Sequence, residues 1–227
     1  MKTYAFIFAR GTSQGVCGKN TRDLAGKPLL AHSIDLAREI DVIDKIYVST
    51  EDQDIAHIAV ERGAEVIDRP AELADHHSQE WSAWQHAVKW LKDRGQSFDV
   101  FLSLPTTSPL RNRQDILAAL KRLDINTDIV LTMTPATRSP WFNMVKKTED
   151  GLIKLVIDNA PLVTRRQDAP IAFNLTTVAY VTRPEFIMSN EGVLQGRVAG
   201  IEIPEERALD IDSEYDLRIA NLLMRSN

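Results

Sequence analysis

Short apolar runs alternate with amphipathic segments through the first 133 residues, and this alternation limits the possible folds more than any other feature. The apolar runs have the length and composition of buried strands, and the segments between them carry apolar residues at helical spacing. Repeated strand–helix units favour a doubly wound α/β fold, a mostly parallel sheet with helices on both faces. Strands are predicted at residues 4–9, 45–50, 64–67, 99–104 and 129–133, with helices beginning at Lys27-Pro28 and covering 52–63, 78–93 and 113–123.

The alternation is interrupted between residues 134 and 170. This stretch contains two short extended segments, 143–147 and 152–156, joined by the turn sequence Glu149-Asp150-Gly151, and it does not form a strand–helix–strand unit. We therefore predict one domain over residues 1–227 with a small insertion at about 134–170. After the insertion, strands are predicted at 172–181 and 198–203 and helices at 184–188 and 213–225.

The first predicted strand leads into a glycine-rich loop that closes on Lys19-Asn20. Glycines at positions 11, 15 and 18 let backbone N–H groups approach an anion without obstruction by Cβ atoms. Arg10 and Lys19 add a positive charge at each end, so the loop is predicted to bind phosphate groups. Ser13 stands where a Walker A loop has glycine, and the spacing does not fit the dinucleotide fingerprint. The alternative is an ordinary strand-to-helix turn with two solvated cations.

Composition narrows the class of protein. The net charge of −5 over 227 residues argues against nucleic acid as a partner but allows a local cationic patch. The single cysteine, Cys17, cannot form an internal disulfide, which favours a reducing compartment. No apolar run approaches the ~20 residues of a membrane span, and the first residues lead directly into a strand rather than a signal peptide. We therefore expect a cytoplasmic protein with no membrane partner.

Two carboxylates near the C-terminus, Asp210 and Asp212, stand two residues apart, so at strand spacing they share a face. Hard oxygen ligands at a strand end suit Mg²⁺, which keeps several waters and is completed by substrate phosphates. The alternative is one capping and one solvated aspartate before a helix that Ser213 could cap.

Six stretches of the sequence form an ordered set. They are A-R-G-x-S-x-G-x-x-x-K-N from Ala9, L-A-G-K-P-L-L-A-H-S-I from Leu24, V-S-T-E-D at 48–52, R-P-A-E-L-A at 69–74, P-T-T-S-P-L-R at 105–111 and L-D-I-D-S-E-Y-D-L at 209–217. The set resembles the sugar-activating cytidylyltransferases and is most similar to the CMP-N-acylneuraminate (CMP-sialic acid) synthetase family. The resemblance covers nearly the whole chain and implies a fold like that of the nucleotide-diphospho-sugar transferases, which is Rossmann-like.

The resemblance implies roles on the nucleotide side of the site. Arg10 and Lys19 would hold the β- and γ-phosphates of CTP, and together with Asp210 they are the expected catalytic residues. Asp210 and Asp212 would bind Mg²⁺, the expected cofactor. Gln14 stands where many relatives have lysine, which removes one charge from the loop. The expected nucleotide-binding residues are Arg10, Gly11, Ser13, Gln14, Lys19, Asn20, Arg69 and Pro70.

Departures from the family pattern lie on the acceptor side. The P-T-T-S-P-L-R loop resembles the family's Q-P-T-S-P-L-R, but Leu104 replaces a glutamine that helps to bind the sugar acid. Arg165 and Arg166 would clamp the carboxylate of that acid, because arginine binds carboxylates bidentately; an exposed basic spot is the alternative. Arg111, the last residue of the P-T-T-S-P-L-R loop, could instead form an ion pair with Asp115, four residues later on the next helix. The expected sugar-binding residues are Leu104, Thr106, Arg165, Arg166, Gln167 and Tyr180.

The resemblance implies a cytidylyltransferase that joins the anomeric hydroxyl of a 2-keto-3-deoxy sugar acid to CMP and releases pyrophosphate. Catalysis would rest on positioning and charge neutralisation. Three alternatives are a CMP-3-deoxy-manno-octulosonate synthetase, a guanylyl- or uridylyltransferase, and a non-catalytic nucleotide-binding domain. The expected partners are CTP and a small sugar acid. The resemblance also implies a homodimer whose dimerisation arm is the insertion.

Overall fold

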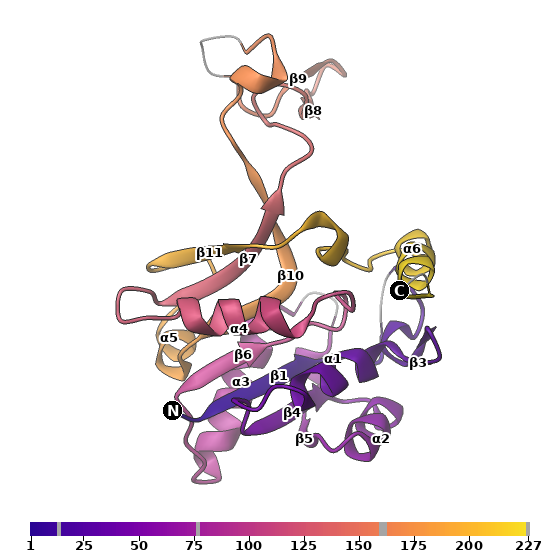
Figure 1. The fold of residues 1–227 in the computed structure, drawn as a ribbon, viewed down its shortest axis with the longest axis vertical. Coiled ribbons are helices and arrows are strands. Elements are labelled where there is room, and N and C mark those ends of the chain that lie inside the picture. The colour runs from indigo at the N-terminus through magenta and orange to yellow at the C-terminus, as the bar shows by residue number, and fades with distance from the viewer. Residues whose placement is uncertain (13–14, 76–77, 159–162, 226–227) are drawn as a thin grey trace.

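The computed structural model describes residues 1–12, 15–75, 78–158 and 163–225, and a seven-stranded sheet lies at its centre (Figure 1). The expected site residues Ser13 and Gln14 lie outside the described residues. The strands of the sheet are β1 (Thr3–Phe8), β4 (Lys45–Thr50), β5 (Glu65–Asp68), β6 (Val100–Ser103), β7 (Ile129–Pro135), β10 (Phe173–Thr182) and β11 (Val198–Glu202). Their order is β11-β7-β10-β6-β1-β4-β5, and all pairs are parallel except those that β10 makes with β6 and β7. The predicted doubly wound, mostly parallel fold is confirmed.

Helices cover both faces of the sheet. They are α1 (Leu29–Arg38), α2 (Gln53–Glu61), α3 (Glu80–Asp93), α4 (Arg113–Arg122), α5 (Pro184–Ser189) and α6 (Glu214–Arg225). The predicted helices agree with these to within a few residues, with one correction at the first. Lys27 and Pro28 form β3 (Lys27–Pro28), which pairs with β2 (Asp23–Leu24), so α1 begins only at Leu29. Among the described residues, no helix is long and apolar enough to cross a membrane.

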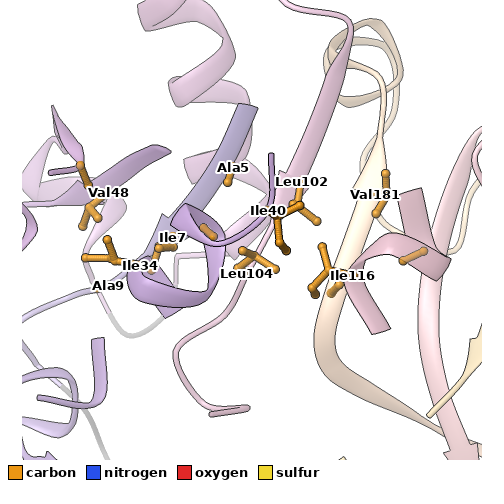
Figure 2. Close-up of a cluster of buried hydrophobic side chains, with 14 of the residues drawn as sticks. Ala5, Ile7, Ala9, Ile34, Ile40, Val48, Leu102, Leu104, Ile116 and Val181 are labelled. Carbon is orange, nitrogen blue, oxygen red and sulfur yellow. The ribbon is translucent and has the colours of Figure 1, made fainter. Parts of the chain in front are cut away.

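Successive side chains of β1 enter two separate cores. Ala5 and Ile7 pack with aliphatic side chains of α1, α2 and α4, and this cluster is drawn in Figure 2. Tyr4 and Phe6 lie on the other face, where they pack with aromatic side chains of α3 and with α5. Burial on both faces explains why the parallel strands read as continuous apolar runs in the sequence.

A third, smaller cluster joins the two ends of the chain. Val16 of the glycine-rich loop and Leu24 of β2 pack with Ile211, and Leu217 of α6 completes the contact. Helix α6 is capped by Ser213, whose Oγ accepts a hydrogen bond from the backbone N–H of residue 216 at 3.3 Å. The cluster holds the segment before α6 against the loop after β1.

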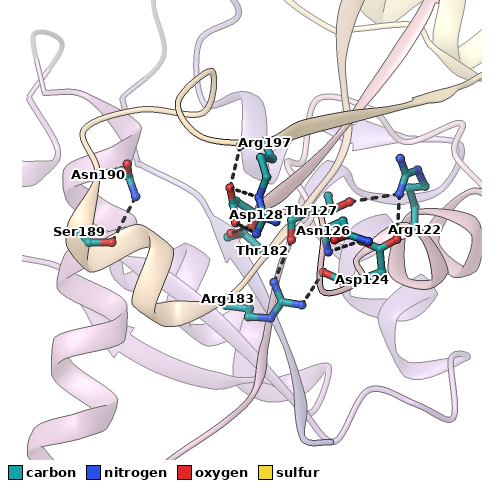
Figure 3. Close-up of polar contacts among 10 residues, drawn as sticks. All are labelled: Arg122, Asp124, Asn126, Thr127, Asp128, Thr182, Arg183, Ser189, Asn190 and Arg197. Atoms are coloured by element: carbon teal, nitrogen blue, oxygen red, sulfur yellow. Dashed lines mark hydrogen bonds and ion pairs between the residues drawn. The ribbon is translucent and has the colours of Figure 1, made fainter.

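A polar network lies at the end of the sheet where β7 and β11 begin and β10 ends (Figure 3). Asp128 accepts hydrogen bonds from the Arg197 guanidinium at 2.7 and 3.0 Å, and these bonds lower the pKa of its carboxyl to about 2. Arg183 donates to the backbone carbonyl of Thr127 at 2.9 Å, and the Thr182 hydroxyl donates to that of Asp128 at 2.7 Å. The network ties three strand ends together.

An extension leaves the sheet between β7 and β10 and projects away from the helical layers (Figure 1). It contains an antiparallel hairpin, β8 (Val145–Lys147) and β9 (Ile153–Leu155), and a short 3-10 helix, Arg166–Asp168. The hairpin strands fall within the segments predicted from the sequence, but β8 begins two residues later and β9 is one residue shorter at each end. The extension begins and ends at two paired strands, so it does not interrupt the order of the sheet.

We expect Ile34→Ala to lower the free energy of unfolding by about 2–5 kcal/mol, because it leaves a cavity in a close-packed cluster. Ile34 on α1 is fully buried, whereas Ile125, in the loop after α4, is 82% exposed. Ile125→Ala is the matched control and should change the free energy of unfolding by less than about 0.5 kcal/mol. Chemical denaturation measures both variants. Equal effects would contradict the packing of α1 against the sheet.

Candidate active site

A cavity of about 380 Å³ opens where β1, β5 and β6 end, which is the edge at which open α/β sheets bind ligands. Of the site residues expected from the sequence, the cavity is lined by Arg10, Lys19, Asn20, Arg69, Thr106 and Asp212. Other lining residues are Phe8, Gly15, Leu73, Ser78, Glu80, Ala83 and Thr107. The cavity therefore brings together segments from the start, middle and end of the chain.

The glycine-rich loop closes onto the backbone that carries the two aspartates. Lys19 Nζ donates to the Ile211 carbonyl at 2.7 Å and lies 3.6 Å from Asp212 Oδ1. Gly15 approaches the same backbone so closely that an added Cβ would lie 1.8 Å from the carbonyl oxygen of Asp212. Gly18 adopts a left-handed conformation with φ of 58°, which lets the chain turn into Lys19. Only glycine permits the contact at position 15.

Asn20 holds the loop together from inside. Its Nδ2 donates to the Arg10 carbonyl at 2.9 Å, and its Oδ1 accepts from the Thr106 hydroxyl at 2.6 Å. Both side chains are buried. At the other end of the loop, the Gly11 N–H donates to Glu51 Oε1 at 2.8 Å. Asn20 and Thr106 thus line the cavity while their polar atoms bond to protein, which ties Asn20 to the backbone of Arg10.

Asp210 and Asp212 lie in different surroundings. Burial raises the pKa of the Asp210 carboxyl, and hydrogen bonds from the hydroxyls of Thr107 and Thr177 oppose that shift. Its Oδ1 is buried and has no hydrogen-bond partner in the part of the chain that the structure describes. The side chain of Asp212 is 76% exposed beside Lys19. An unpartnered buried carboxylate oxygen is costly, so a bound cation would supply the interaction that the protein does not.

Two carboxylates suit a Mg²⁺ ion that takes its other ligands from water and substrate better than they suit a metal whose ligands all come from protein side chains. Within the described ranges, no group of three or more His, Cys, Asp or Glu side chains is placed to hold a metal. Mg²⁺ is usually bound by one or two carboxylates and completes its octahedron with water and phosphate oxygens. Neither aspartate caps α6, since Ser213 and Asp216 do so, and the alternative role of a capping aspartate is not supported.

Thr177 is a site residue that sequence reasoning missed. It lies in a bulge of β10, where the pairing with β7 changes register. Inside the bulge, the Ala179 N–H donates a hydrogen bond to Thr132 Oγ1 at 3.2 Å. The bulge brings the Thr177 hydroxyl to the Asp210 carboxyl and to Thr107 Oγ1, which donates to it at 3.1 Å. Bulges commonly redirect side chains beside functional sites, but no local pattern in the sequence marks this one.

Arg69 is buried in the wall of the cavity. Its Nε donates to the Ser49 hydroxyl at 3.2 Å, one Nη donates to the Ser49 carbonyl at 2.6 Å, and the guanidinium lies 5.7 Å from the centre of the Phe8 ring. Burial lowers the pKa of Arg69, and the charges of Glu51 and Glu80 oppose that shift. These contacts fix a positive charge in the cavity wall. Pro70 does not line the cavity and instead precedes a 3-10 helix, Ala71–Leu73.

Two expectations for the loop after β6 are wrong. Leu104 was expected to contact the sugar, but it is fully buried in the aliphatic core because an apolar side chain at this strand end packs inward. Arg111 was given the alternative of pairing with Asp115, but its Nη1 donates to the Pro105 carbonyl at 2.7 Å, and burial lowers its pKa to about 9. Asp115 pairs with Arg207 instead, at 2.9 Å.

The remaining acceptor-side residues do not line the cavity of their own chain. Arg165, Arg166 and Gln167 lie in the extension, where Arg165 pairs with Asp168 at 2.6 Å (Figure 1). Tyr180 on β10 packs edge-on against Trp84, with ring centres 5.5 Å apart. Burial and the charges of Glu80 and Asp210 raise the pKa of the Tyr180 hydroxyl. The structure therefore places Arg10, Lys19, Asn20, Arg69 and Asp212 around one cavity, and it places the two arginines of the expected clamp outside that cavity.

Comparisons with known proteins agree with this geometry. A family profile described as Cytidylyltransferase matches residues 4–206. A Campylobacter coli protein named post-translational flagellin modification protein B is 32% identical, over 96% of this chain and 93% of its own length. A Campylobacter jejuni protein named CMP-N,N'-diacetyllegionaminic acid synthase is 30% identical over the same two shares, 96% and 93%.

One solved structure shares the whole fold. It is a CMP:2-keto-3-deoxy-manno-octonic acid synthetase complexed with CTP, with a TM-score of 0.73. The match covers 100% of this chain and 99% of that one. At 16% identity, the likeness establishes the architecture and nothing about the substrate.

We expect Gly15→Ala to open the contact between the loop and the aspartate segment, because its Cβ would collide with backbone. The expected result is faster amide hydrogen exchange in both residues 15–22 and residues 209–213. Gly192→Ala is the matched control, since a Cβ there meets nothing within 4 Å. Hydrogen exchange followed by mass spectrometry measures both segments. Faster exchange in the loop alone would contradict the coupling of the two segments.

Proposed function

This chain belongs to the cytidylyltransferase family, and we propose that it transfers the cytidylyl group of CTP to the anomeric hydroxyl of a nine-carbon 2-keto-3-deoxy sugar acid. The products are a CMP-sugar and pyrophosphate. The relative named for CMP-N,N'-diacetyllegionaminic acid supports a nine-carbon acceptor, because it aligns over 96% of this chain at 30% identity. The eight-carbon alternative rests on the structural neighbour at 16% identity, which shares only the fold.

One observation carries this proposal: the cationic loop and Asp212 line a single cavity, and Lys19 bonds to the backbone between Asp212 and Asp210. Lys19 lies 3.6 Å from Asp212 and is bonded to the backbone between the aspartates. A triphosphate carries several negative charges, so it needs cations on one side and a cation-binding carboxylate pair on the other. The cavity wall carries the cations and one of the two carboxylates, Asp212, and the other, Asp210, stands two residues away in the chain.

We assign the phosphate contacts to Arg10, Lys19 and the loop backbone. In the reaction, the anomeric oxygen of the sugar acid bonds to the α-phosphorus while the bond from that phosphorus to the bridging oxygen of the β-phosphate breaks. Pyrophosphate leaves with that oxygen, and the hydroxyl proton passes to water. Arg10 and Lys19 stabilise the charge that develops on the departing pyrophosphate. The protein's contribution is mainly orientation and charge neutralisation.

We assign Mg²⁺ to Asp210 and Asp212. When bound, the ion neutralises phosphate charge and lowers the pKa of a coordinated hydroxyl. Asp210 supplies a carboxylate oxygen that has no partner among the described residues, and the hydroxyls of Thr107 and Thr177 orient that carboxylate.

Cys17 has no possible partner for an internal disulfide, and this favours a cytoplasmic location for the enzyme.

We propose that the protein is a homodimer in which the extension completes the partner's site. The extension exposes large apolar side chains, including Leu152, Ile153 and Ile171, which are 65–85% exposed in the single chain. Such an apolar surface is typical of an interface. Arg165 and Arg166 lie on the same extension and do not line the cavity of their own chain, so a partner chain can use them to bind the carboxylate of the sugar acid.

We expect the unmodified protein to release pyrophosphate from CTP and Mg²⁺ with one acid among N-acetylneuraminate, legionaminate, pseudaminate and 3-deoxy-manno-octulosonate. Asp210→Asn should lower kcat by about 10²–10³-fold, because it removes a charge that the transition state requires. Asp41→Asn, at a side chain that is 91% exposed on the far surface, is the control and should keep full activity. A coupled pyrophosphate assay measures all three. Full activity in Asp210→Asn would overturn the metal assignment, and no turnover with any acid would overturn the proposed reaction.

We expect co-expressed Arg165→Ala and Asp210→Ala chains to regain activity that neither homodimer has. If extensions are exchanged, each mixed dimer contains one intact site, so random pairing restores about a quarter of the sites. Light scattering verifies the dimer, and differently tagged chains allow purification of the mixed species. Absence of recovery in purified mixed dimers would show that each chain completes its own site.

A further inference from the structure

One acidic side chain in the cavity, Glu80, has no place in the chemistry described so far. A carboxyl group in a cavity that binds a triphosphate repels the ligand unless the ligand also brings a hydrogen-bond donor to it. Glu80 is the first residue of α3, on the face of the sheet that carries the aromatic core. It lines the same cavity as Lys19 and Asp212. The question is which part of the substrate meets it.

The carboxyl of Glu80 is held in a fixed orientation. Its Oε1 accepts a hydrogen bond from Trp84 Nε1 at 3.0 Å, one helical turn along α3. Trp84 is 2% exposed, and its ring lies 5.1 Å from that of Phe101 and 5.5 Å from that of Tyr180. The indole therefore cannot move without disturbing the core. With Oε1 engaged by Trp84, Oε2 is the oxygen left to bind a ligand in the cavity.

The surroundings of Glu80 suit an uncharged, polar group of a ligand. The side chain is exposed to the cavity, yet protein surrounds the carboxyl, and this burial raises its pKa. The hydrogen bond from Trp84 and the positive charges of Arg69 and Arg10 oppose the shift. Phe8 and Ala83 add apolar surface to the same cavity. An acceptor, a buried guanidinium and an aromatic ring are the groups that a planar base with both donors and acceptors requires.

We propose that Glu80 recognises the nucleobase by accepting a hydrogen bond from the exocyclic amine of cytosine, and so distinguishes CTP from UTP. Uracil carries a carbonyl oxygen in place of that amine, and two acceptors facing each other are unfavourable. Pairing of a glutamate with this amine is a known mode of cytosine recognition. Arg69 lines the same cavity, and its charge acts on Glu80, so it provides the positive charge that suits the ring carbonyl of the base. This inference rests on the proposed function, because it takes CTP as the nucleotide.

Removal of the amine from the ligand tests the inference without any sugar acid. Calorimetry compares the binding of CTP with that of 2-pyrimidinone ribonucleoside triphosphate, which lacks only the amine. The unmodified protein should bind the analogue about 10–100-fold more weakly than CTP. In Glu80→Ala the two ligands should bind within about twofold of each other, because the group that senses the amine is gone.

The variant Glu80→Gln distinguishes a change in base recognition from a general loss of structure. Its carbonyl oxygen can still accept the bond from Trp84, which leaves the amide NH₂ facing the cavity. That group donates to the carbonyl of uracil and opposes the amine of cytosine, so the preference for CTP over UTP should fall by about 10-fold or more. Glu61→Ala, at an exposed side chain on α2, is the matched control and should keep the preference of the unmodified protein. Near-ultraviolet circular dichroism shows whether the aromatic core is intact in each variant.

Three results would overturn the inference. The first is that the amine contributes equally to nucleotide binding in the unmodified protein and in Glu80→Ala. The second is that Glu80→Gln keeps the full preference for CTP. The third is that Glu80→Ala changes only the KM of the sugar acid, which would assign Glu80 to the acceptor. The first two results are independent of the proposed reaction, because nucleotide binding is measured at equilibrium without turnover, whereas the third requires turnover of the acid. Tight binding of CTP with no transfer to any acid would instead overturn the proposed function and leave the role of Glu80 intact.

Discussion

The contact between Lys19 and the carbonyl of Ile211 is the interaction on which the site depends. It spans 2.7 Å and joins residues 192 positions apart in the sequence. Gly15 lies directly against the backbone of Asp212 on the loop side of this contact. The small apolar cluster around Val16 and Ile211 packs beside it. Because one contact sets both the cationic loop and the aspartate pair, neither group can be displaced without displacing the other. The positions of Lys19 and Asp212 are therefore set by a backbone hydrogen bond and by packing, in addition to the attraction between their charges.

The cavity and the aspartate segment beside it hold polar groups that the described part of the protein satisfies only in part. Burial raises the pKa of both Asp210 and Glu80, and Asp210 keeps a carboxylate oxygen without a partner in the described part of the chain. These groups cost stability in the free protein, and a ligand with matching charges and donors would remove that cost. The arrangement is a preorganised polar site in which little rearrangement is needed once the ligand is bound. The rigid aromatic layer beneath α3 and the polar network at Asp128 keep the surrounding strands in place.

The sequence predicted most of the fold and the nucleotide side of the site, because both follow from short-range patterns. Apolar runs and their spacing indicated the strands, and ordered motifs at strand ends indicated that Arg10, Lys19 and Asp212 share one edge. The acceptor side was less predictable. Leu104 was assigned by its position in a motif, although the chemistry of its side chain directs it into the core. Thr177 was missed because a bulge, which depends on pairing with a distant strand, determines where it points.

The extension joins the sheet through two neighbouring, hydrogen-bonded strands, β7 and β10. The two points of attachment are fixed by the sheet, so the entropy of closing the loop between them grows only slowly with its length. The segment between them is free to lengthen, shorten or exchange its side chains while the sheet and its cavity persist. If the extension binds the acceptor, as proposed above, recognition of the acceptor is separable from activation of the nucleotide. Replacement of one peripheral segment would then change the acid that is activated while the chemistry at the sheet edge is conserved.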